Sequence, residues 1–411
     1  MKLLLVCKSK VMENLGVMYL SAVATEAGCL SHISDINQMV DDANTWHPDI
    51  IGLSIMTGDQ NTFKEKLTLL KTTESWNPKI IIGGPHPTFF PQDCDWADTI
   101  IPGEAENALA ELFGFQKRYS DLDSMPWPDR SCFPDMKIRD FISSRGCPYN
   151  CSYCYNDRWN KMFPDIPKVR TRSPKDVVAE IASVNPQFAY FQDSCFGVSI
   201  KWMREFAKLY RAEIKAPYHC HLRPNQVTPE RAGLLSASGC YSTRIALETA
   251  SPRLRTLIHR AHTSNDEVYE AAKNLSRVNI KLMIQNILCL PTSTIEDDLN
   301  TLEVNIKAAP DYAWCSIFMP YPGTVLGDLC VQNGWYKGDY SDITDSFFDH
   351  SVLDISPEYR EQSFYLQKCF ALCVKVKEIP KPEELTAERF PMLVHRLMRK
   401  DGDKILYGGI I

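Results

Sequence analysis

The sequence predicts an α/β protein in three parts: a doubly wound domain, a partial (β/α)6 barrel and a small, mostly helical C-terminal region. Three observations predict this order. Short apolar runs alternate with amphipathic stretches over residues 1–114. The alternation stops in a proline-rich segment, 115–140, which we interpret as a linker. It then resumes for six strand–helix units over 141–325 and weakens over 326–411.

Five apolar runs mark the strands of the first domain: "KLLLVC", "LSHISDI", "DIIGLSI", "KIIIGG" and "DTIIPG". Continuous apolar strands between amphipathic helices indicate a parallel sheet covered on both faces, a Rossmann-like arrangement. Ligands bind such sheets beyond the carboxyl ends of the strands, which here are residues 54–58, 83–87 and 103–107. The fingerprint G-x-G-x-x-G is absent after the first strand, which argues against a dinucleotide.

Six further runs mark the barrel strands: "DFISSRG", "FAYFQDS", "YHCHLR", "STRIALE", "LMIQNILCLP" and "WCSIFMP". Helical patterns separate them, so they predict an open, TIM-like barrel with too few residues for eight units. Active sites of such barrels lie at the carboxyl ends of the strands. Beyond the barrel, "EYREQSFYLQKCFALCVKVK" predicts a helix, on which Cys369 and Cys373 share one face. We expect core packing there rather than a second metal site.

The composition is that of an ordinary globular protein, with 44% hydrophobic and 23% charged residues. A net charge of −6 argues against a nucleic-acid partner, because proteins that bind nucleic acid carry a surplus of basic residues. The opening "MKLLLVCKSK" has too short an apolar run for a signal peptide, and no stretch has the length of a membrane span. We therefore expect a cytoplasmic protein.

Three cysteines, Cys147, Cys151 and Cys154, lie directly after the first barrel strand with the spacing C-x3-C-x2-C. A structural zinc site normally has four protein ligands, and no fourth ligand follows at zinc-finger spacing. A [4Fe–4S] cluster is usually held by four cysteines, one per iron. Three cysteines would leave one iron open to another ligand. The alternative is a zinc-stabilised interaction module without catalysis.

The segment "RGCPYNCSYC" resembles the signature of the radical S-adenosylmethionine (SAM) enzymes, C-x3-C-x-φ-C with φ aromatic, and Tyr153 is the aromatic residue. The resemblance implies that SAM chelates the open iron and is cleaved by an electron from the cluster. It also implies an electron donor such as flavodoxin or ferredoxin.

The resemblance extends to other strand ends of the barrel. It implies that Asp193 contacts the SAM amino group, that Arg223 meets the SAM carboxylate, and that Glu248 lies at the family's "GLE" segment, where Ala246 replaces the usual glycine. Arg suits a carboxylate because it forms a charge-assisted fork. His219 and His221 face one side of their strand. They are either a metal pair or, as we expect, polar residues lining the barrel.

The first domain resembles the cobalamin-binding domain of B12-dependent radical SAM enzymes over residues 1–114, in "ENLGVMYLSAVATEAG", "DIIGLSIMTGD", "IIIGGPHPTFFP" and "IIPGEAENALAEL". The residues this resemblance places at cobalamin are Ser54, Thr57, Gly83, Gly84, Pro85, His86, Gly103 and Glu104. The string D-x-H-x-x-G is absent, so cobalt would lack its usual histidine, and we expect His86 to be a loop residue rather than a cobalt ligand. The alternative is a degenerate domain that has lost B12.

These resemblances together imply a cobalamin-dependent radical SAM methyltransferase, in which methylcobalamin delivers a methyl group to a small-molecule or peptide substrate. The alternative keeps both cofactors without methyl transfer and catalyses a ring closure, contraction or oxidation.

Overall fold

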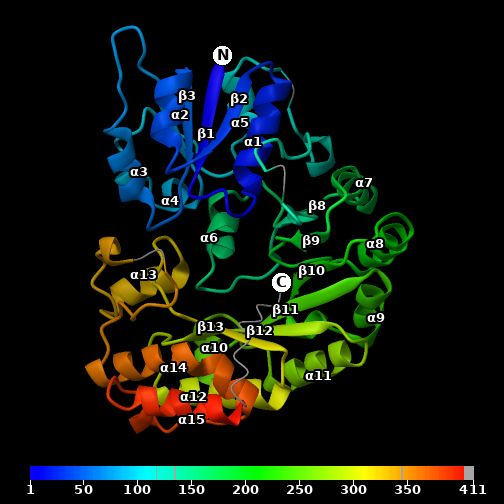
Figure 1. The fold of residues 1–411 in the computed structure, drawn as a ribbon, viewed down its shortest axis with the longest axis vertical. Helices are drawn as coiled ribbons and strands as arrows, with labels where there is room; N and C mark the ends of the chain where they lie inside the picture. The colour runs from blue at the N-terminus through cyan, green and yellow to red at the C-terminus, as the bar shows by residue number, and fades with distance from the viewer. Residues whose placement is uncertain (117, 134–135, 344–345, 402–411) are drawn as a thin grey trace. The chain divides into compact units, whose positions relative to one another are not determined.

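The computed structural model describes residues 1–116, 118–133, 136–343 and 346–401. The chain divides into two compact units (Figure 1). Unit 1 comprises Met1–Phe141 and Arg170–Arg172, and unit 2 comprises Ile142–Val169 and the residues from Ser173 onward. Small parts of the predicted linker, at 117 and 134–135, and of the predicted C-terminal region, at 344–345 and 402–411, lie outside the described residues.

Unit 1 contains a five-stranded parallel sheet with the strand order β2-β1-β3-β4-β5. The strands are β1 (Lys2–Cys7), β2 (Leu30–Asp35), β3 (Ile50–Ser54), β4 (Lys79–Gly83) and β5 (Thr99–Ile100). The helices that connect and follow them are α1 (Leu15–Glu26), α2 (Met39–Trp46), α3 (Gln60–Leu67), α4 (Pro85–Phe89), the 3-10 turn η1 (Pro91–Asp93) and α5 (Glu106–Leu112). This is the predicted doubly wound arrangement.

Both faces of this sheet are buried, and β1 shows why its sequence is continuously apolar. Leu3 and Leu5 belong to a core cluster with residues of α1 and α5. Leu4 and Val6, which alternate with them, belong to a second cluster with residues of α2 and α3. Successive side chains of a strand point to opposite faces, so each face is covered by its own pair of helices.

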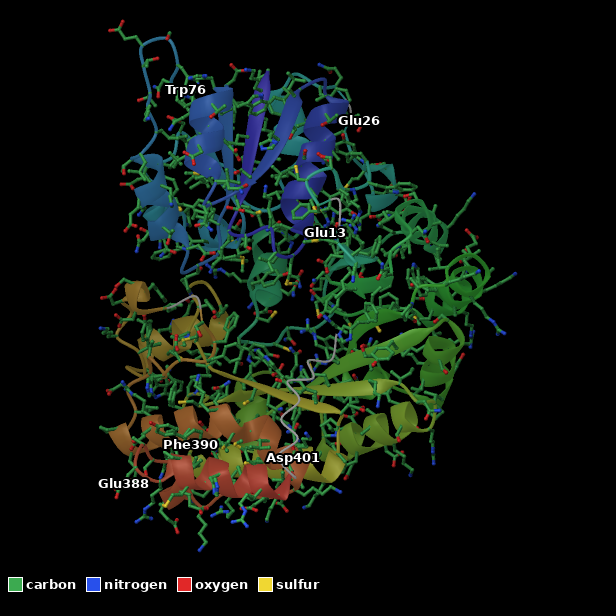
Figure 2. All side chains as sticks on the ribbon, viewed as in Figure 1. Glu13, Glu26, Trp76, Glu388, Phe390 and Asp401 are labelled. Carbon is green, nitrogen blue, oxygen red and sulfur yellow. The ribbon has the colours of Figure 1, made fainter. Side chains whose placement is uncertain are left out.

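Within unit 1, a buried charge cluster around Glu13 holds the segment that follows α5 against the rest of the unit. Glu13 is labelled in Figure 2. The Glu13 side chain is fully buried and accepts Nη1 of Arg130 at 2.5 Å and Nη1 of Arg139 at 2.7 Å. It also accepts the backbone N–H of Asp140 at 2.7 Å. The 3-10 turn η2 (Leu122–Ser124) lies in the same segment. A buried carboxylate needs such partners, since an unpaired one is strongly destabilising.

The second sheet has six strands in the order β13-β12-β11-β10-β9-β6. They are β6 (Ile138–Phe141), β9 (Phe188–Phe191), β10 (Tyr218–Leu222), β11 (Cys240–Glu248), β12 (Lys281–Leu288) and β13 (Tyr312–Ile317). The intervening helical segments are α7 (Pro174–Val184), α8 (Ile200–Glu213), η3 (Pro224–Gln226), α9 (Pro229–Ala237), α10 (Pro252–Leu257), α11 (Asn265–Ser276) and α12 (Ile295–Ala308). Neighbouring strands in sequence are neighbours in the sheet, which is the predicted open barrel.

The first barrel strand differs from its prediction, because the run 140–146 does not form one continuous strand. β6 ends at Phe141, and the chain resumes as β7 (Ser144–Gly146), which pairs with β8 (Val169–Thr171) in a separate two-stranded sheet. The cause is the buried carboxylate of Asp193, which accepts the backbone N–H of Ser143 at 2.9 Å and its hydroxyl at 2.6 Å. Where Ser143 makes these bonds, the chain leaves the six-stranded sheet.

The described part of the C-terminal region is mostly helical, as predicted. Its elements are α13 (Val325–Gln332), η4 (Tyr340–Asp342), α14 (Pro357–Val376), η5 (Pro382–Glu384) and α15 (Phe390–Lys400). Cys369 and Cys373 on α14 are both buried in a cluster that includes Leu288 and Cys315 from β12 and β13. Their sulfur atoms lie 3.7 Å apart, and this core position agrees with the packing role expected of them. Within the described ranges, no helix has the length and apolar character needed to cross a bilayer.

Candidate functional site

The three-cysteine loop joins β7 to α6 (Tyr155–Met162) in unit 2. All three thiols are free; Cys151 is buried, whereas Cys147 and Cys154 are partly exposed. Backbone contacts fix the loop in the middle of its turn. Ser152 donates its N–H to the carbonyl of Ile258 at 3.2 Å and its hydroxyl to that of Leu257 at 2.9 Å. The C-terminal end of α10 therefore positions the thiols.

Cationic and amide groups surround the sulfur atoms. Nη1 of Arg223 lies 3.8 Å and Nη1 of Arg260 lies 3.9 Å from Sγ of Cys151. Nδ2 of Asn156 lies 3.4 Å from Sγ of Cys154. The Nε atoms of both arginines are buried and have no hydrogen-bond partner among the described residues. Neighbouring cations favour thiolates, so this donor set fits a cluster carried by anionic sulfur ligands.

The thiols do not converge on a single point. Among the described residues, no three His, Cys, Asp or Glu side chains are placed to hold one metal ion together, and this includes the three cysteines. In an iron–sulfur cluster each thiolate binds a different iron, so the ligands stand apart around the cluster. Burial raises the pKa of the Cys154 thiol to about 11, and metal binding would release that proton. Three cysteine ligands fit a cluster in which the fourth iron stays open to another ligand.

Arg223 is held in a fixed orientation beside the cysteines. Its guanidinium lies 3.7 Å from the centroid of the Tyr149 ring, and its Nη2 donates to Nε2 of His262 at 3.1 Å. Tyr149 and His262 are themselves stacked, with ring planes 9° apart. Burial, followed by the charge of Arg223, lowers the pKa of His262, so its ring is the neutral acceptor this bond requires. A rigid cation of this kind can bind a carboxylate.

Glu248 occupies a strained position at the end of β11. Its φ angle is +65°, in the left-handed region, and the register of β11 against β12 shifts between Ala246 and Glu248. A non-glycine residue there is uncommon and is often found at functional sites. The turn directs the Glu248 carboxylate to the hydroxyl of Tyr153, which donates at 2.6 Å. Burial raises the pKa of Glu248, and the nearby charge of Arg260 opposes this effect.

The structure therefore brings three of the residues predicted at SAM, Tyr153, Arg223 and Glu248, close to the predicted cluster ligand Cys151. Asp193 has other partners, because Ser143 and Ser144 donate four hydrogen bonds to its carboxylate. Its contact with SAM stays a prediction. Sequence reasoning missed Tyr149, Arg260 and His262. Tyr149 lies inside the cysteine motif and could have been weighed as an aromatic platform, but no local signal marks the other two.

A cavity of about 210 Å³ opens beside this group. Tyr153 and Glu248 form part of its wall, and Gln285 and Trp314 come from β12 and β13. The remaining lining is mostly apolar and aromatic: Ile287, Ser316, Ile317, Phe318, Met319, Tyr321 and Phe347. A mostly apolar space with a few convergent polar groups is typical of a binding site for a small organic molecule.

His219 and His221 lie on the same face of β10, as predicted. Nδ1 of His219 is 2.7 Å from the hydroxyl of Ser242, and Nε2 of His221 is 3.2 Å from that of Tyr190. Both imidazoles therefore contact hydroxyl groups on neighbouring strands, and their role as a polar lining of the barrel stays a prediction.

In unit 1, the carboxyl ends of β3 and β4 form a tight backbone cradle at Gly84. Its φ angle is +97°. An added Cβ would lie 2.9 Å from both the backbone N and the backbone O of Ile55. Thr88 connects this loop to the next, since its hydroxyl donates to the Gly84 carbonyl at 2.7 Å and accepts the Gly103 N–H at 3.0 Å. Only glycine fits at position 84. The hydrogen bonds of Thr88 bring the predicted loops 83–87 and 103–107 together here.

Both ring nitrogens of His86 are engaged within unit 1. Nδ1 lies 3.2 Å from the hydroxyl of Thr57, and Nε2 lies 3.2 Å from Oδ2 of Asp93. The side chain is 1% exposed, and its burial lowers the pKa of His86 against the opposing charge of Asp93. With both nitrogens occupied, His86 is placed to order the loop that contains Gly83, Gly84 and Pro85, and its role at cobalamin stays a prediction.

The other residues predicted at this end of the sheet have separate positions. Ser54 ends β3 and is partly exposed. Glu104 forms an ion pair with Arg170, and both residues belong to unit 1. The contacts of Ser54, Thr57 and Glu104 with cobalamin stay predictions.

Comparison with known proteins agrees with this two-part arrangement. Residues 1–113 match the family model described as the B12 binding domain, and residues 141–304 match that of the radical SAM superfamily. An uncharacterized methyltransferase of Pyrococcus horikoshii is 23% identical over 377 residues, which cover 78% of each protein. A bacteriochlorophyllide d C-8(2)-methyltransferase of Chlorobaculum tepidum is 24% identical over 284 residues, covering 60% of this chain and 61% of that protein.

Two solved structures share the fold over most of the chain. The cobalamin-dependent S-adenosylmethionine radical enzyme OxsB, with aqua-cobalamin bound, has a TM-score of 0.69 at 16% identity, covering 97% of this chain and 72% of that one. The radical S-adenosylmethionine methyltransferase TsrM from Kitasatospora setae, with tryptophan and a SAM analogue bound, has a TM-score of 0.65 at 16% identity. The match covers 81% of this chain and 76% of that one.

Proposed function

We propose that this chain, a radical SAM enzyme with an N-terminal B12-binding domain, is a methyltransferase that methylates an unactivated centre of a small-molecule or peptide substrate. Its cofactors are a [4Fe–4S] cluster, SAM and cobalamin. The cluster supplies an electron for SAM cleavage, and the corrinoid supplies the methyl group. The electron comes from a donor such as flavodoxin or ferredoxin.

One observation carries the proposal: the three thiols share a site with two arginines whose Nε atoms are buried and unpartnered. Cys147, Cys151 and Cys154 would hold the cluster and leave one iron open. Arg223 is the cation for the SAM carboxylate, since its guanidinium is fixed by ring stacking.

The other side chains of this site position SAM. Glu248 and Tyr153 border the cavity and are the hydrogen-bonding pair beside it. The left-handed backbone at Glu248 holds this carboxylate in place without a long flexible loop. In unit 1 the missing side chain at Gly84 lets this loop pack against the backbone of Ile55, and this loop belongs to the segment proposed to bind cobalamin.

The methyl-transfer step is supported by two relatives whose names describe methyltransferases, from Pyrococcus horikoshii and Chlorobaculum tepidum. The competing outcome, radical chemistry without methyl transfer, leaves different products. Methyl transfer uses one SAM as radical source and another as methyl source, so 5′-deoxyadenosine and S-adenosylhomocysteine form together. A rearrangement or oxidation yields the first without the second.

The test is anaerobic reconstitution of the full chain with iron, sulfide and hydroxocobalamin, followed by turnover with methyl-deuterated SAM, a reductant and a metabolite extract. We expect a product whose mass includes the deuterated methyl group, together with both nucleoside by-products. A variant in which the three cluster cysteines are Ala is the control and should form neither by-product. Deoxyadenosine formation in the extract without label transfer or S-adenosylhomocysteine would reject methylation in favour of the alternative.

A further inference from the structure

A cluster of polar side chains lies on the inner face of the barrel sheet, the face that also carries the cavity residue Gln285. Three neighbouring strands contribute to it: Tyr190 from β9, His219 and His221 from β10, and Ser242 and Arg244 from β11. Strand register explains their proximity. His219 is paired with Tyr190 on one side and with Ser242 on the other, and His221 is paired with Arg244.

Arg244 carries the only side-chain charge of this cluster. Its Nη2 donates to Nδ1 of His221 at 3.0 Å, which places the His221 proton on Nε2, facing the Tyr190 hydroxyl. Burial, followed by the charge of Arg244, lowers the pKa of His219 to about 3 and that of His221 well below its ordinary value. Both imidazoles are therefore neutral at physiological pH.

The charge of Arg244 is only partly balanced, because Glu248, whose charge acts on it, also interacts with the charges of Arg223 and Arg260. Arg244 is partly buried, and no carboxylate among the described residues forms an ion pair with it. The next carboxylate along β11 belongs to Glu248, which instead accepts the Tyr153 hydroxyl. Cations removed from water are normally paired, because desolvating a charge is costly. A partly buried arginine that makes no ion pair in the described structure, and that shares Glu248 with two other arginines, leaves a positive charge for an anion to balance.

A second, independent observation points the same way. His219 is 2% exposed and its Nε2 has no hydrogen-bond partner in the described structure. This atom lies on the same inner face, with the His219 ring stacked on Tyr190 at 4.7 Å between centroids. Buried polar atoms are almost always satisfied, so this atom is a second open position for a polar ligand.

The cluster and the cavity belong to one continuous inner face. Arg244 is paired with Met283 of β12, and the next inward pair along these strands is Ala246 with Gln285. Gln285 is in turn paired with Trp314, and both line the cavity. A molecule in the cavity that extends down this face would place one end at Arg244 and the other among aromatic side chains.

We propose that Arg244, together with the open Nε2 of His219, binds a carboxylate group of the substrate, whose apolar or aromatic body occupies the cavity at Trp314. This inference rests on the proposed function, because it assigns the cavity to the substrate. Charge balance selects the carboxylate. One guanidinium matches one negative charge in a planar, forked geometry, whereas a phosphate dianion would leave a surplus negative charge near Glu248.

The test measures binding to the reconstituted full chain with SAM already bound, so that the carboxylate of SAM cannot account for the result. The probes are hydrocinnamate, its uncharged amide and phenyl phosphate, and affinity is measured by calorimetric titration. We expect hydrocinnamate to bind roughly ten- to a hundred-fold more tightly than its amide, the range for a hydrogen bond to a charged group. It should also bind more tightly than phenyl phosphate.

Arg244→Gln should abolish the preference for the acid over the amide, and Arg244→Lys should restore part of it, because Lys keeps the charge but loses the fork. Arg204→Gln is the matched control. It removes an exposed arginine on α8 that pairs with Glu230, and it should leave the preference unchanged. Thermal midpoints separate ligand binding from a structural role: removing a cation that makes no ion pair in the described structure should not lower the midpoint of Arg244→Gln.

Equal binding of hydrocinnamate and its amide to the wild type, including no saturable binding of either, would overturn the proposal. So would a preference that survives in Arg244→Gln, or tighter binding of phenyl phosphate. These measurements need no turnover. A chain that fails to transfer a methyl group can still show the preference, and a chain that transfers one can lack it, so the two proposals fail separately.

Discussion

Replacing Glu248 by Ala or by Gly isolates the backbone strain at the end of β11. Both variants lose the carboxylate that bonds to Tyr153, and they differ only in the Cβ atom at φ +65°. A left-handed backbone costs an L-residue about 1–2 kcal/mol. The greater freedom of unfolded glycine offsets about 0.5–1 kcal/mol of this. The Gly variant should therefore be more stable than the Ala variant by about 1 kcal/mol.

The assay is thermal unfolding of the metal-free chain under reducing conditions. The quantity compared is the midpoint of the transition in which unit 2 unfolds. A difference of this size corresponds to about 2–4 °C in midpoint for a unit of this length. Exposed Glu205 in the middle of α8 is the matched control. There the Gly variant should be less stable than the Ala variant, because glycine disfavours a helix interior by about 1 kcal/mol. Equal midpoints for the two Glu248 variants would refute the strain argument.

The same pair of variants also tests the role of the carboxylate. Both should retain iron, because Glu248 does not bind the cysteines. Both should bind SAM about ten- to a hundred-fold more weakly, since one hydrogen bond of a charged group is lost and the Tyr153 hydroxyl is left without its acceptor. Calorimetric titration with SAM provides the measurement, and unchanged affinity in both variants would place SAM elsewhere.

Three further predictions concern other parts of the chain. Replacing the three cluster cysteines by Ala should abolish iron uptake in elemental analysis, whereas Cys220→Ala should keep it; cluster absorbance in the triple variant would contradict the assignment. Burial raises the pKa of Asp298 from 3.8 to about 7. Because the folded protein holds this proton more tightly than the unfolded chain does, protonation of Asp298 stabilises the fold. This stabilisation is complete below the ordinary pKa and is lost as the pH rises through about 7. The thermal midpoint should fall more in wild type than in Asp298→Asn between about pH 5 and pH 8, and parallel curves would exclude the shift. Gly84→Ala should weaken hydroxocobalamin binding and destabilise unit 1 by about 1–3 kcal/mol because of the contacts at 2.9 Å; Gly28→Ala, also at positive φ but with nothing within 4 Å, should leave binding intact.

Most of the fold could be predicted because each strand has a recognisable apolar pattern in its own short stretch of sequence. Residues 2–7 are apolar at every position from Leu3 to Cys7, and the structure buries both faces of that strand. The division of the first barrel strand could not be predicted in this way. It depends on Asp193, which is fifty residues from Ser143 in sequence, so no local pattern records it.

The site shows the same limit. The cysteine spacing and the strand-end position of Glu248 could be read from the sequence. The left-handed turn at Glu248 arises from the register shift against β12, which requires two strands to be aligned in space. Arg260 follows α10 in a stretch without a strand-end signal, and it reaches Cys151 only through the tertiary fold, across 109 positions.

The charge cluster at Glu13 limits how far the chain can be truncated when unit 1 is expressed alone. A fragment ending at residue 114, the boundary that the strand–helix alternation suggests, would retain Glu13 and lose both Arg130 and Arg139. Removing the partners of a buried ion is destabilising by about 3–5 kcal/mol, a large part of the stability of a small domain. An expression fragment of the corrinoid-binding half should therefore extend through Phe141, so that the carboxylate keeps its two arginines.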